Sequence, residues 1–205
     1  MSIPRYTLYG RAGSGSDIVQ MLLEEIGAPY DFMHIAKDPA ELEKYRRINP
    51  TGKIPALVLP QGLTMVESAA ICMQLAASHP DARLAPTPGT VEHARFLQWM
   101  VYLSTNLYEC ALRIYYPHRY SRLGEKAAED IKQQANEDFP KILGTIVPTL
   151  SPYVLGEKIS AVDYYLYVVG GWHPDGREPL HKQWPALGRH TQLLAGRPSV
   201  RKVEA

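Results

Sequence analysis

The chain has few cysteines, almost no excess of charge and no long apolar run, and each absence excludes a class of protein. Only Cys72 and Cys110 occur, each inside an apolar helical pattern, which favours buried free thiols in a reducing compartment over a disulfide framework. Lys and Arg number 22 against 21 Asp and Glu, and no basic stretch is interleaved with aromatic residues. A polyanionic partner such as a nucleic acid is therefore not indicated.

Membrane and metal signals are equally scarce. No apolar run reaches the length of a transmembrane helix, so no membrane partner is expected. Residues 1–5 lack the charged-then-apolar layout of a signal peptide, which favours a cytoplasmic location. His34 and His118 have no metal-ligating partners at useful spacing, so we expect no metal site.

The first part of the chain alternates short strand and helix patterns. The expected elements are strands at 5–9 and 30–35, helices at 16–26, 41–47 and 67–79, and a strand pair joined by a turn at Gln61 and Gly62. The order is βαβ followed by αββα. It predicts an N-terminal α/β domain over residues 1–79, with a mixed four-stranded sheet and helices on both faces, the thioredoxin-like βαβαββα arrangement.

The second part of the chain is helical in pattern. Residues 80–89 form the expected linker, because proline is concentrated there and no period is visible. Ser160 and Asp163 have the spacing of a helix capping box. The expected helices are 91–115, 126–150, 161–171 and 185–195. They predict an all-α bundle over 90–205, with the two long helices paired as an antiparallel hairpin.

The segment N-P-T-G-K-I-P, Asn49 to Pro55, and the later Glu67 and Ser68 carry the most information about function. An Ile-Pro bond entering a strand is a candidate cis peptide, which would turn the Ile54 N–H and C=O outward to pair with an extended peptide. Ser68 and the first amides of its helix would hold a carboxylate, and Glu67 an ammonium. The pattern predicts a site for a small extended peptide with an amino-acid head.

These motifs resemble the glutathione-binding half of the cytosolic glutathione transferase superfamily, in which N-P-x-G-x-(Val/Ile)-P and E-S-x-A-I segments occur. The segments 184–190 and 197–200 also resemble that family's closing helices, so the resemblance covers nearly the whole chain. It implies the thioredoxin-like fold with a helical second domain. It also implies glutathione as cosubstrate and a homodimer.

The resemblance assigns roles to individual residues. Ile54 would pair with the cysteinyl part of glutathione, and Pro55 would be the cis proline. Glu67 and Ser68 would bind the γ-glutamyl head. Lys53, beside Ile54 in the motif, and Arg11, whose charge would lie near the thiolate, complete the candidate glutathione-binding residues, which are Arg11, Lys53, Ile54, Pro55, Glu67 and Ser68.

Glutathione chemistry needs a donor in the first loop, Tyr9-Gly-Arg-Ala-Gly-Ser-Gly-Ser-Asp17, because a free thiol of pKa ~8.5 is only about 3% ionised at pH 7. We rank Ser14 first, Ser16 second and Tyr9 third as catalytic candidates, since the glycines around the serines allow close approach to a ligand. The alternatives are helix capping by either serine, with Ser14 and Asp17 spaced as a capping box, and packing of the Tyr9 ring. The loop departs from every common class pattern of the family.

The electrophile site is expected between the first loop and the long helix of the second domain. Aromatic rings with a polar tip suit a planar or amphipathic acceptor, and Arg113 suits an anionic one. The candidate second-substrate residues are Tyr102, Tyr108, Arg113 and Tyr116. The alternative is that most of these tyrosines pack within the helix hairpin.

The favoured function is a glutathione transferase that conjugates the glutathione thiolate to a small apolar or aromatic electrophile. A different glutathione reaction, such as isomerisation, dehalogenation or peroxide reduction, is the first alternative. A non-enzymatic interaction module on the same fold is the second. Such modules tend to lose the Glu-Ser pair, and its presence at Glu67 and Ser68 favours the enzyme.

Overall fold

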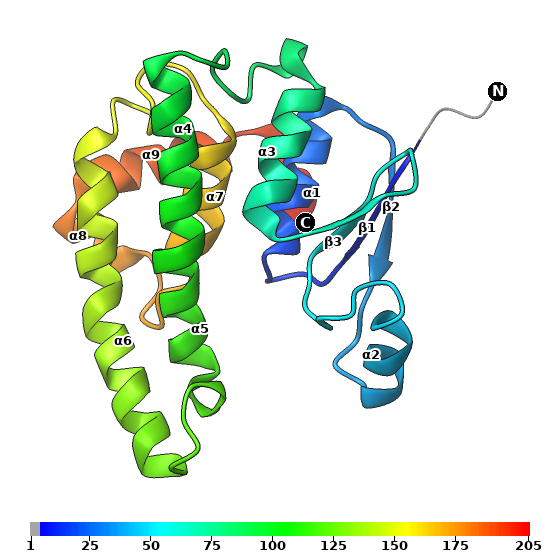
Figure 1. The fold of residues 1–205 in the computed structure, drawn as a ribbon. Helices are drawn as coiled ribbons and strands as arrows, with labels where there is room; N and C mark the ends of the chain where they lie inside the picture. The colour runs from blue at the N-terminus through cyan, green and yellow to red at the C-terminus, as the bar shows by residue number, and fades with distance from the viewer. Residues whose placement is uncertain (1–4) are drawn as a thin grey trace. The chain divides into compact units, whose positions relative to one another are not determined.

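A computed structural model of the 205-residue chain describes residues 5–205, which form two compact units (Figure 1). Unit 1 contains the described residues up to Ala85 together with Gly196–Ala205, and unit 2 contains Pro86–Ala195. Residues 1–4, on which the signal-peptide expectation partly rests, lie outside the described residues. Within 5–205 no helix is both long and apolar enough to cross a membrane.

Unit 1 is built on a four-stranded mixed sheet in the order β2-β1-β3-β4. Strand β1 is parallel to β2 and antiparallel to β3, which is antiparallel to β4. The elements of unit 1 are β1 (Tyr6–Gly10), α1 (Ser16–Ile26), β2 (Tyr30–His34), α2 (Pro39–Tyr45), β3 (Ala56–Val58), β4 (Thr64–Val66), α3 (Ser68–Ser78), η1 (Pro80–Ala82) and α10 (Pro198–Glu204). This confirms the predicted thioredoxin-like arrangement.

The two faces of the sheet are covered by different helices. Leu8 and its cross-strand partner Leu57 are fully buried on the face that α1 covers. On the opposite face Tyr9, Ala56 and Val66 lie in register and pack with Tyr45, the last residue of α2. Because side chains alternate along a strand, Tyr9 and its neighbour Leu8 face opposite layers.

Helix boundaries follow local capping chemistry. Helix α1 has the predicted bounds, and Gly27 ends it in the left-handed conformation at φ 71°. Helix α2 begins earlier than the predicted residue 41, because the Asp38 carboxylate accepts from the N–H groups of Ala40 and Glu41 at 3.0 Å. Pro39 at the first helical position supports this early start.

The last helix, α10, belongs to unit 1, which differs from the expected grouping of residues 90–205 in one helical domain. It packs on α1, and its residues Ser199 and Val200 are buried. Arg197 pairs with the Glu25 carboxylate, and the Ser199 hydroxyl donates to the same carboxylate at 2.7 Å. Lys202 pairs with Glu24 at 2.7 Å. These ion pairs and the buried Val200 attach the segment to unit 1.

Unit 2 is helical throughout its regular elements, as predicted. Helix α5 runs beside α6, and together with α4 it forms the long hairpin arm that is green in Figure 1. The elements are α4 (Val91–Tyr102), the π-helical η2 (Leu103–Tyr108), α5 (Glu109–Tyr115), η3 (Pro117–Arg119), α6 (Glu125–Ile146), η4 (Val147–Thr149), α7 (Ala161–Gly170), α8 (Glu178–Gln183) and α9 (Pro185–Ala195). Helix α8 was not predicted from the sequence.

Helix α7 forms the centre of unit 2, and every one of its residues is buried. Ser160 and Asp163 form the predicted capping box at its start. The buried Asp163 carboxylate also accepts from the Val154 N–H at 2.8 Å and lies 3.1 Å from Nε2 of His190. These contacts give Ser160 and Asp163 a structural role, because they fix the entry to the core helix.

Candidate functional site

The turn from Asn49 to Pro55 is held by side chains that bond its backbone. Asn49 is 1% exposed. Its Nδ2 donates to the Lys53 carbonyl at 2.7 Å, and its Oδ1 accepts from the backbone N–H and the hydroxyl of Thr51 at 3.1 and 2.9 Å. The Tyr45 hydroxyl donates to the same Lys53 carbonyl at 2.8 Å. Two buried donors on one carbonyl fix the peptide plane that precedes Ile54.

The bond between Ile54 and Pro55 is cis, as predicted. Among residues 5–205, no hydrogen-bond partner is found for the backbone N–H or C=O of Ile54. The Ile54 side chain packs against the apolar cluster of Ile35, Tyr45 and Ala56. The side chain therefore anchors Ile54, while its backbone keeps an unpaired N–H and an unpaired C=O. An added extended peptide strand requires such a donor and acceptor.

Strand register brings the predicted glutathione-binding segments to one end of the sheet. Ala56 pairs with Val66, so the residue before β3, Pro55, lies beside the residue after β4, Glu67. Ala56 also pairs with Tyr9, so the first loop leaves the sheet at the same end. Three segments far apart in sequence thus converge there, and their convergence defines the candidate site.

Glu67 has an unusual backbone conformation, with φ 67° and ψ 103°. A residue other than glycine in such a region costs about 1–3 kcal/mol, and such residues cluster at ligand-binding sites. The Glu67 side chain is exposed, and no described residue pairs with its carboxylate. The next residue, Ser68, is 8% exposed and opens α3. An acidic residue with a strained backbone therefore lies at the N-terminal, positive end of helix α3.

The two serines of the first loop differ in burial. Ser16 is fully buried, and its hydroxyl accepts from the Arg11 N–H at 2.9 Å and lies 2.8 Å from the Arg11 carbonyl. A β-carbon at Gly10 would lie 2.3 Å from the Ser16 β-carbon, so glycine is required there. Ser14 is half-buried, and its Oγ lies 2.6 Å from the Arg11 carbonyl. Ser16 closes the loop, whereas Ser14 lies nearer its surface.

Tyr9 and Arg11 are tied to other parts of unit 1. The Tyr9 ring packs against the Tyr45 ring, with ring centroids 5.9 Å apart, on the face of the sheet that α2 covers. The Arg11 guanidinium donates to the Ile35 carbonyl at 2.9 Å. Lys53 is exposed beside Ile54. Tyr9 therefore lies in the apolar support of the site rather than in the loop itself.

The predicted second-substrate residues lie along the arm formed by α4, η2 and α5, except Tyr116, which directly follows α5. The Tyr102 hydroxyl donates to the Ile142 carbonyl on α6 at 3.1 Å. The half-buried Tyr108 ring meets the Trp172 ring edge-on, with centroids 4.9 Å apart. The hydroxyl of Tyr102 therefore helps to pair the hairpin, and Tyr108 is packed against the loop after α7.

Arg113 and Tyr116 lie at the end of the same arm. Arg113 is half-buried near Cys110, where burial raises the pKa of the thiol and the guanidinium lowers it, with a net rise. The Arg119 guanidinium lies 4.0 Å above the Tyr116 ring. Cys72 is buried too, and its burial raises the pKa of its thiol, so both cysteines are the free buried thiols that the sequence predicts.

The sequence alone did not mark Tyr45 and Asn49 as contributors to this site, although both bond the Lys53 carbonyl. Asn49 was noted only as part of a motif. For Tyr45, the available signal is a single aromatic residue at the end of the otherwise polar helix P-A-E-L-E-K-Y. Such an isolated ring predicts a buried contact.

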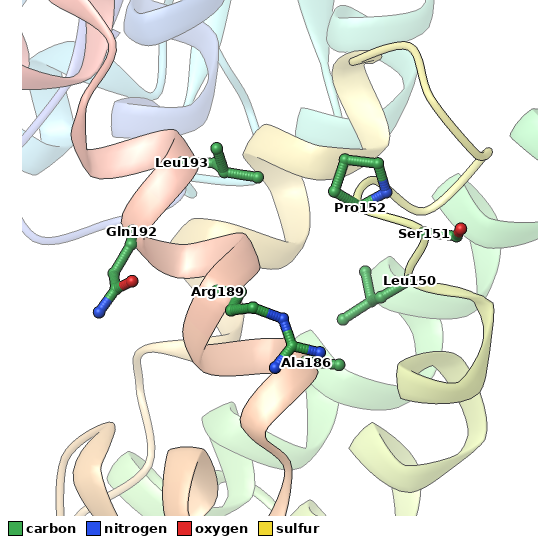
Figure 2. Close-up of a pocket in the computed structure, with 7 residues that line it drawn as sticks. All are labelled: Leu150, Ser151, Pro152, Ala186, Arg189, Gln192 and Leu193. Carbon is green, nitrogen blue, oxygen red and sulfur yellow. The ribbon is translucent and has the colours of Figure 1, made fainter.

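Unit 2 has a hollow of its own, with a volume of about 550 Å³, between α9 and the segment that follows η4 (Figure 2). It is lined by Leu150, Ser151, Pro152, Ala186, Arg189, Gln192 and Leu193. Its polar side chains are exposed, and it contains none of the predicted site residues. It is a surface depression, distinct from the candidate site of unit 1.

The thioredoxin-like unit, the open backbone at a cis-proline turn and the helical unit together define the class: the chain belongs to the glutathione transferase superfamily. Residues 16–78 match the family model for the glutathione S-transferase N-terminal domain, and residues 106–198 match that for the C-terminal domain. An uncharacterized GST-like protein of Escherichia coli K12, YncG, is 31% identical over 82% of both chains. The resemblance proposed from the motifs is thus confirmed.

Two further relatives bear on the function. A crystal structure of a glutathione transferase homologue from Sulfitobacter, with bound glutathione, has a TM-score of 0.90 and 29% identity over 98% of both chains. A probable elongation factor 1-gamma 1 of Arabidopsis thaliana is 30% identical over 87% of this chain and 42% of that protein. The expected cosubstrate, glutathione, accords with the first of these.

Proposed function

We propose that the protein binds glutathione along Ile54 and Pro55 and activates its thiol for conjugation to an apolar or aromatic electrophile. The observation that carries this proposal is the unpaired N–H and C=O of Ile54, at the end of the sheet where Glu67 and the first loop also lie. The cysteinyl residue of glutathione pairs with these two groups as a short antiparallel strand.

The two ends of glutathione find charges of opposite sign. Ser68 and the first amides of α3 receive the γ-glutamyl carboxylate, and the Glu67 carboxylate receives the neighbouring ammonium. The exposed Lys53 ammonium receives the glycyl carboxylate, and Arg11 adds positive charge near the thiolate. The tripeptide is thereby oriented with its sulfur toward the first loop.

Activation of the thiol requires a donor. Lowering the pKa of the glutathione thiol by about two units corresponds to ~2.7 kcal/mol of extra stabilisation of the thiolate. A helix N-terminus with one hydroxyl donor supplies this order of energy. We assign the donor role to Ser14, because both serine hydroxyls bond the Arg11 carbonyl but only Ser16 is fully buried, and because Tyr9 is packed on the α2 face.

The reaction then proceeds in two steps. The thiol proton leaves to solvent, and the Ser14 hydroxyl turns from the Arg11 carbonyl to donate to the thiolate. A lone pair of the sulfur forms the new C–S bond, and the leaving group departs with the electrons of the broken bond. The candidate contacts of the electrophile remain Tyr108, Arg113, Tyr116 and the ring of Tyr102, whose hydroxyl stays bonded to α6.

The test combines binding and turnover. The purified chain is passed over immobilised glutathione and assayed with an aromatic halide, and Ser68→Ala is compared with Ser78→Ala at the other end of the same helix α3. Loss of a charge-assisted hydrogen bond of ~1.5–3 kcal/mol predicts an affinity lower by about ten- to hundredfold for Ser68→Ala only. Equal affinities in the two variants would contradict the proposed binding mode.

A non-enzymatic module is the second candidate, favoured by the similarity to elongation factor 1-gamma. It predicts neither retention on glutathione nor turnover of any electrophile. Retention with turnover of a peroxide, a maleyl compound or an alkyl halide, but not of an aromatic halide, would instead indicate another glutathione reaction.

We also propose, from family membership, that the protein is a cytoplasmic homodimer. Leu97 and Val101, one turn apart on α4, are 40% and 50% exposed and form an apolar stripe. The measurement is sedimentation of the pure protein, with an expected mass near twice the 23.0 kDa of one chain. Leu97→Glu is expected to shift the mass toward that of one chain.

A further inference from the structure

Asp17 ends the first loop as defined above, is the second residue of α1, and has no role in the function proposed above. Its carboxylate accepts from the Gly13 N–H at 2.8 Å, and its own N–H donates to the Ser14 carbonyl at 3.1 Å. A single residue of α1 therefore holds two consecutive loop residues, one through its side chain and one through its backbone.

The side-chain bond has the backward direction of the acidic partner in a capping box, which accepts from the amide three residues before it. Asp17 bonds the amide four residues before it, that of Gly13 at the tip of the loop. Its side chain therefore reaches backward to a residue outside the helix. The carboxylate thus serves the loop rather than the amides of the helix.

The tip of the loop has little other support. Ala12 and Gly13 are exposed, and Gly13 is in the left-handed region at φ 74° with open space around its α-carbon. The inner part of the loop is closed by the buried Ser16 hydroxyl on Arg11. Ser14 lies between these two anchors, so the position of its hydroxyl depends on both.

The charge environment of Asp17 shows that the contact has a cost. Burial raises the pKa of this carboxyl, the Gly13 and Ser14 amides lower it, and the Glu204 carboxylate on α10 adds a smaller rise, so that the net pKa is about 6. At pH 7 the group is ionised although its surroundings disfavour the charge. An amide side chain would fill the same space without that cost.

We propose that Asp17 is a positioning residue, whose carboxylate fixes the tip of the first loop and thereby aims the Ser14 hydroxyl at the sulfur of glutathione. This inference rests on the proposed function. It adds a residue that touches neither the cosubstrate nor the electrophile but sets the geometry of the residue that does.

The test measures the pKa of the bound glutathione thiol by its thiolate absorbance, at saturating glutathione, in Asp17→Ala, Asp17→Asn and Asp17→Glu. Asp17→Ala is expected to raise that pKa by about one unit and to lower kcat/KM about tenfold at pH 7. Asp17→Asn keeps an oxygen acceptor for the Gly13 N–H, and it is expected to retain the wild-type value or a slightly lower one.

Asp17→Glu keeps the charge but moves the carboxylate by one methylene, so a rise in the thiol pKa is expected there as well. It serves as the readout if Asp17→Ala does not fold. Asp31→Ala is the matched control, because Asp31 is an exposed carboxylate of the same unit, paired with Arg5. This control is expected to leave the thiol pKa unchanged.

The possible results distinguish a failure of the positioning role from a failure of the proposed function. If Ser14→Ala raises the thiol pKa and both Asp17→Ala and Asp17→Glu leave it at the wild-type value, the positioning role is overturned while the proposed function stands. If Asp17→Asn and Asp17→Ala shift it equally, the role is also overturned, because charge alone would then explain the effect. If the wild type fails to bind glutathione, the proposed function fails first.

Discussion

The cis-proline turn and the first loop lie at the same end of one sheet and use their hydrogen bonds in opposite ways. In the turn, Asn49 and Tyr45 saturate the Lys53 carbonyl and leave the backbone of Ile54 open. In the loop, the Ser14 and Ser16 hydroxyls are both bonded to the Arg11 carbonyl. The proposed binding groups of the turn are thus already unpaired, whereas the proposed donor, the Ser14 hydroxyl, must first leave an internal partner.

The largest expected effect comes from weakening the turn. Asn49→Ala removes a buried donor and a buried acceptor and is expected to lower the free energy of unfolding by ~2–3 kcal/mol, with glutathione binding about tenfold weaker. Urea unfolding and titration calorimetry measure the two effects. Asn106→Ala, an exposed asparagine of unit 2, is the control, and an equal loss of affinity there would show that the turn has no special part in binding.

The hydroxyls of the two loop serines lie 2.8 Å apart, but the two variants are expected to differ in which property changes most. Ser14→Ala is expected to raise the pKa of the bound glutathione thiol by about one to two units, since a donor to the thiolate is lost. Ser16→Ala is expected to lower the free energy of unfolding by ~1–2 kcal/mol, because a fully buried hydroxyl is removed from the Arg11 amide. Thiolate absorbance across pH and thermal unfolding distinguish them. An unshifted pKa in Ser14→Ala would transfer the donor role to another group.

Replacing Glu67 by glycine is expected to change stability and glutathione binding in opposite directions. Glycine tolerates φ 67°, so Glu67→Gly is expected to raise the free energy of unfolding by about 1 kcal/mol while it weakens glutathione binding. Glu67→Gln keeps the strained backbone and removes the charge. It should weaken binding without gaining stability, and a gain of stability in both variants would show that the charge, not the backbone, is the cost.

Tyr45→Phe is a finer test of the turn. It removes one of the two donors on the Lys53 carbonyl while Asn49 keeps the other, so a loss of about 1 kcal/mol or less is expected. The measurement is the midpoint of urea unfolding with the slope held constant. A loss as large as that of Asn49→Ala would mean that the Tyr45 hydroxyl, rather than Asn49, is the main support of the turn, because phenylalanine keeps the ring packing.

The smallest effect concerns pH. The folded-state pKa of Asp17, about 6, lies above its ordinary value of 3.8, so ionisation favours the unfolded chain. This group's contribution is absent below pH 3.8 and destabilises the fold progressively as pH rises through 6. Asp17→Asn removes that dependence, and the difference between the two unfolding curves across this range measures it. Solvent screening of the half-exposed group keeps the effect small.

Much of unit 1 could be predicted because its signals are local. The spacing of apolar residues and the stop at Gly27 gave both ends of α1, and the prolines of the turn gave the cis bond at Pro55. Helix α8 was missed because six residues carry too little periodicity. The burial that separates Ser14 from Ser16 depends on Gly10, which lies across the loop, and no pattern along the chain encodes it.

The grouping of α10 with α1 determines which segments of the chain make up unit 1. Unit 1 is discontinuous in sequence, and unit 2 is inserted between Ala85 and Gly196, so the chain passes between the units twice. A fragment cut at residue 85 would lose the buried Val200 and the partner of Glu25. Unit 1 therefore needs both of its segments, the one that ends at Ala85 and the one that begins at Gly196, to keep these contacts.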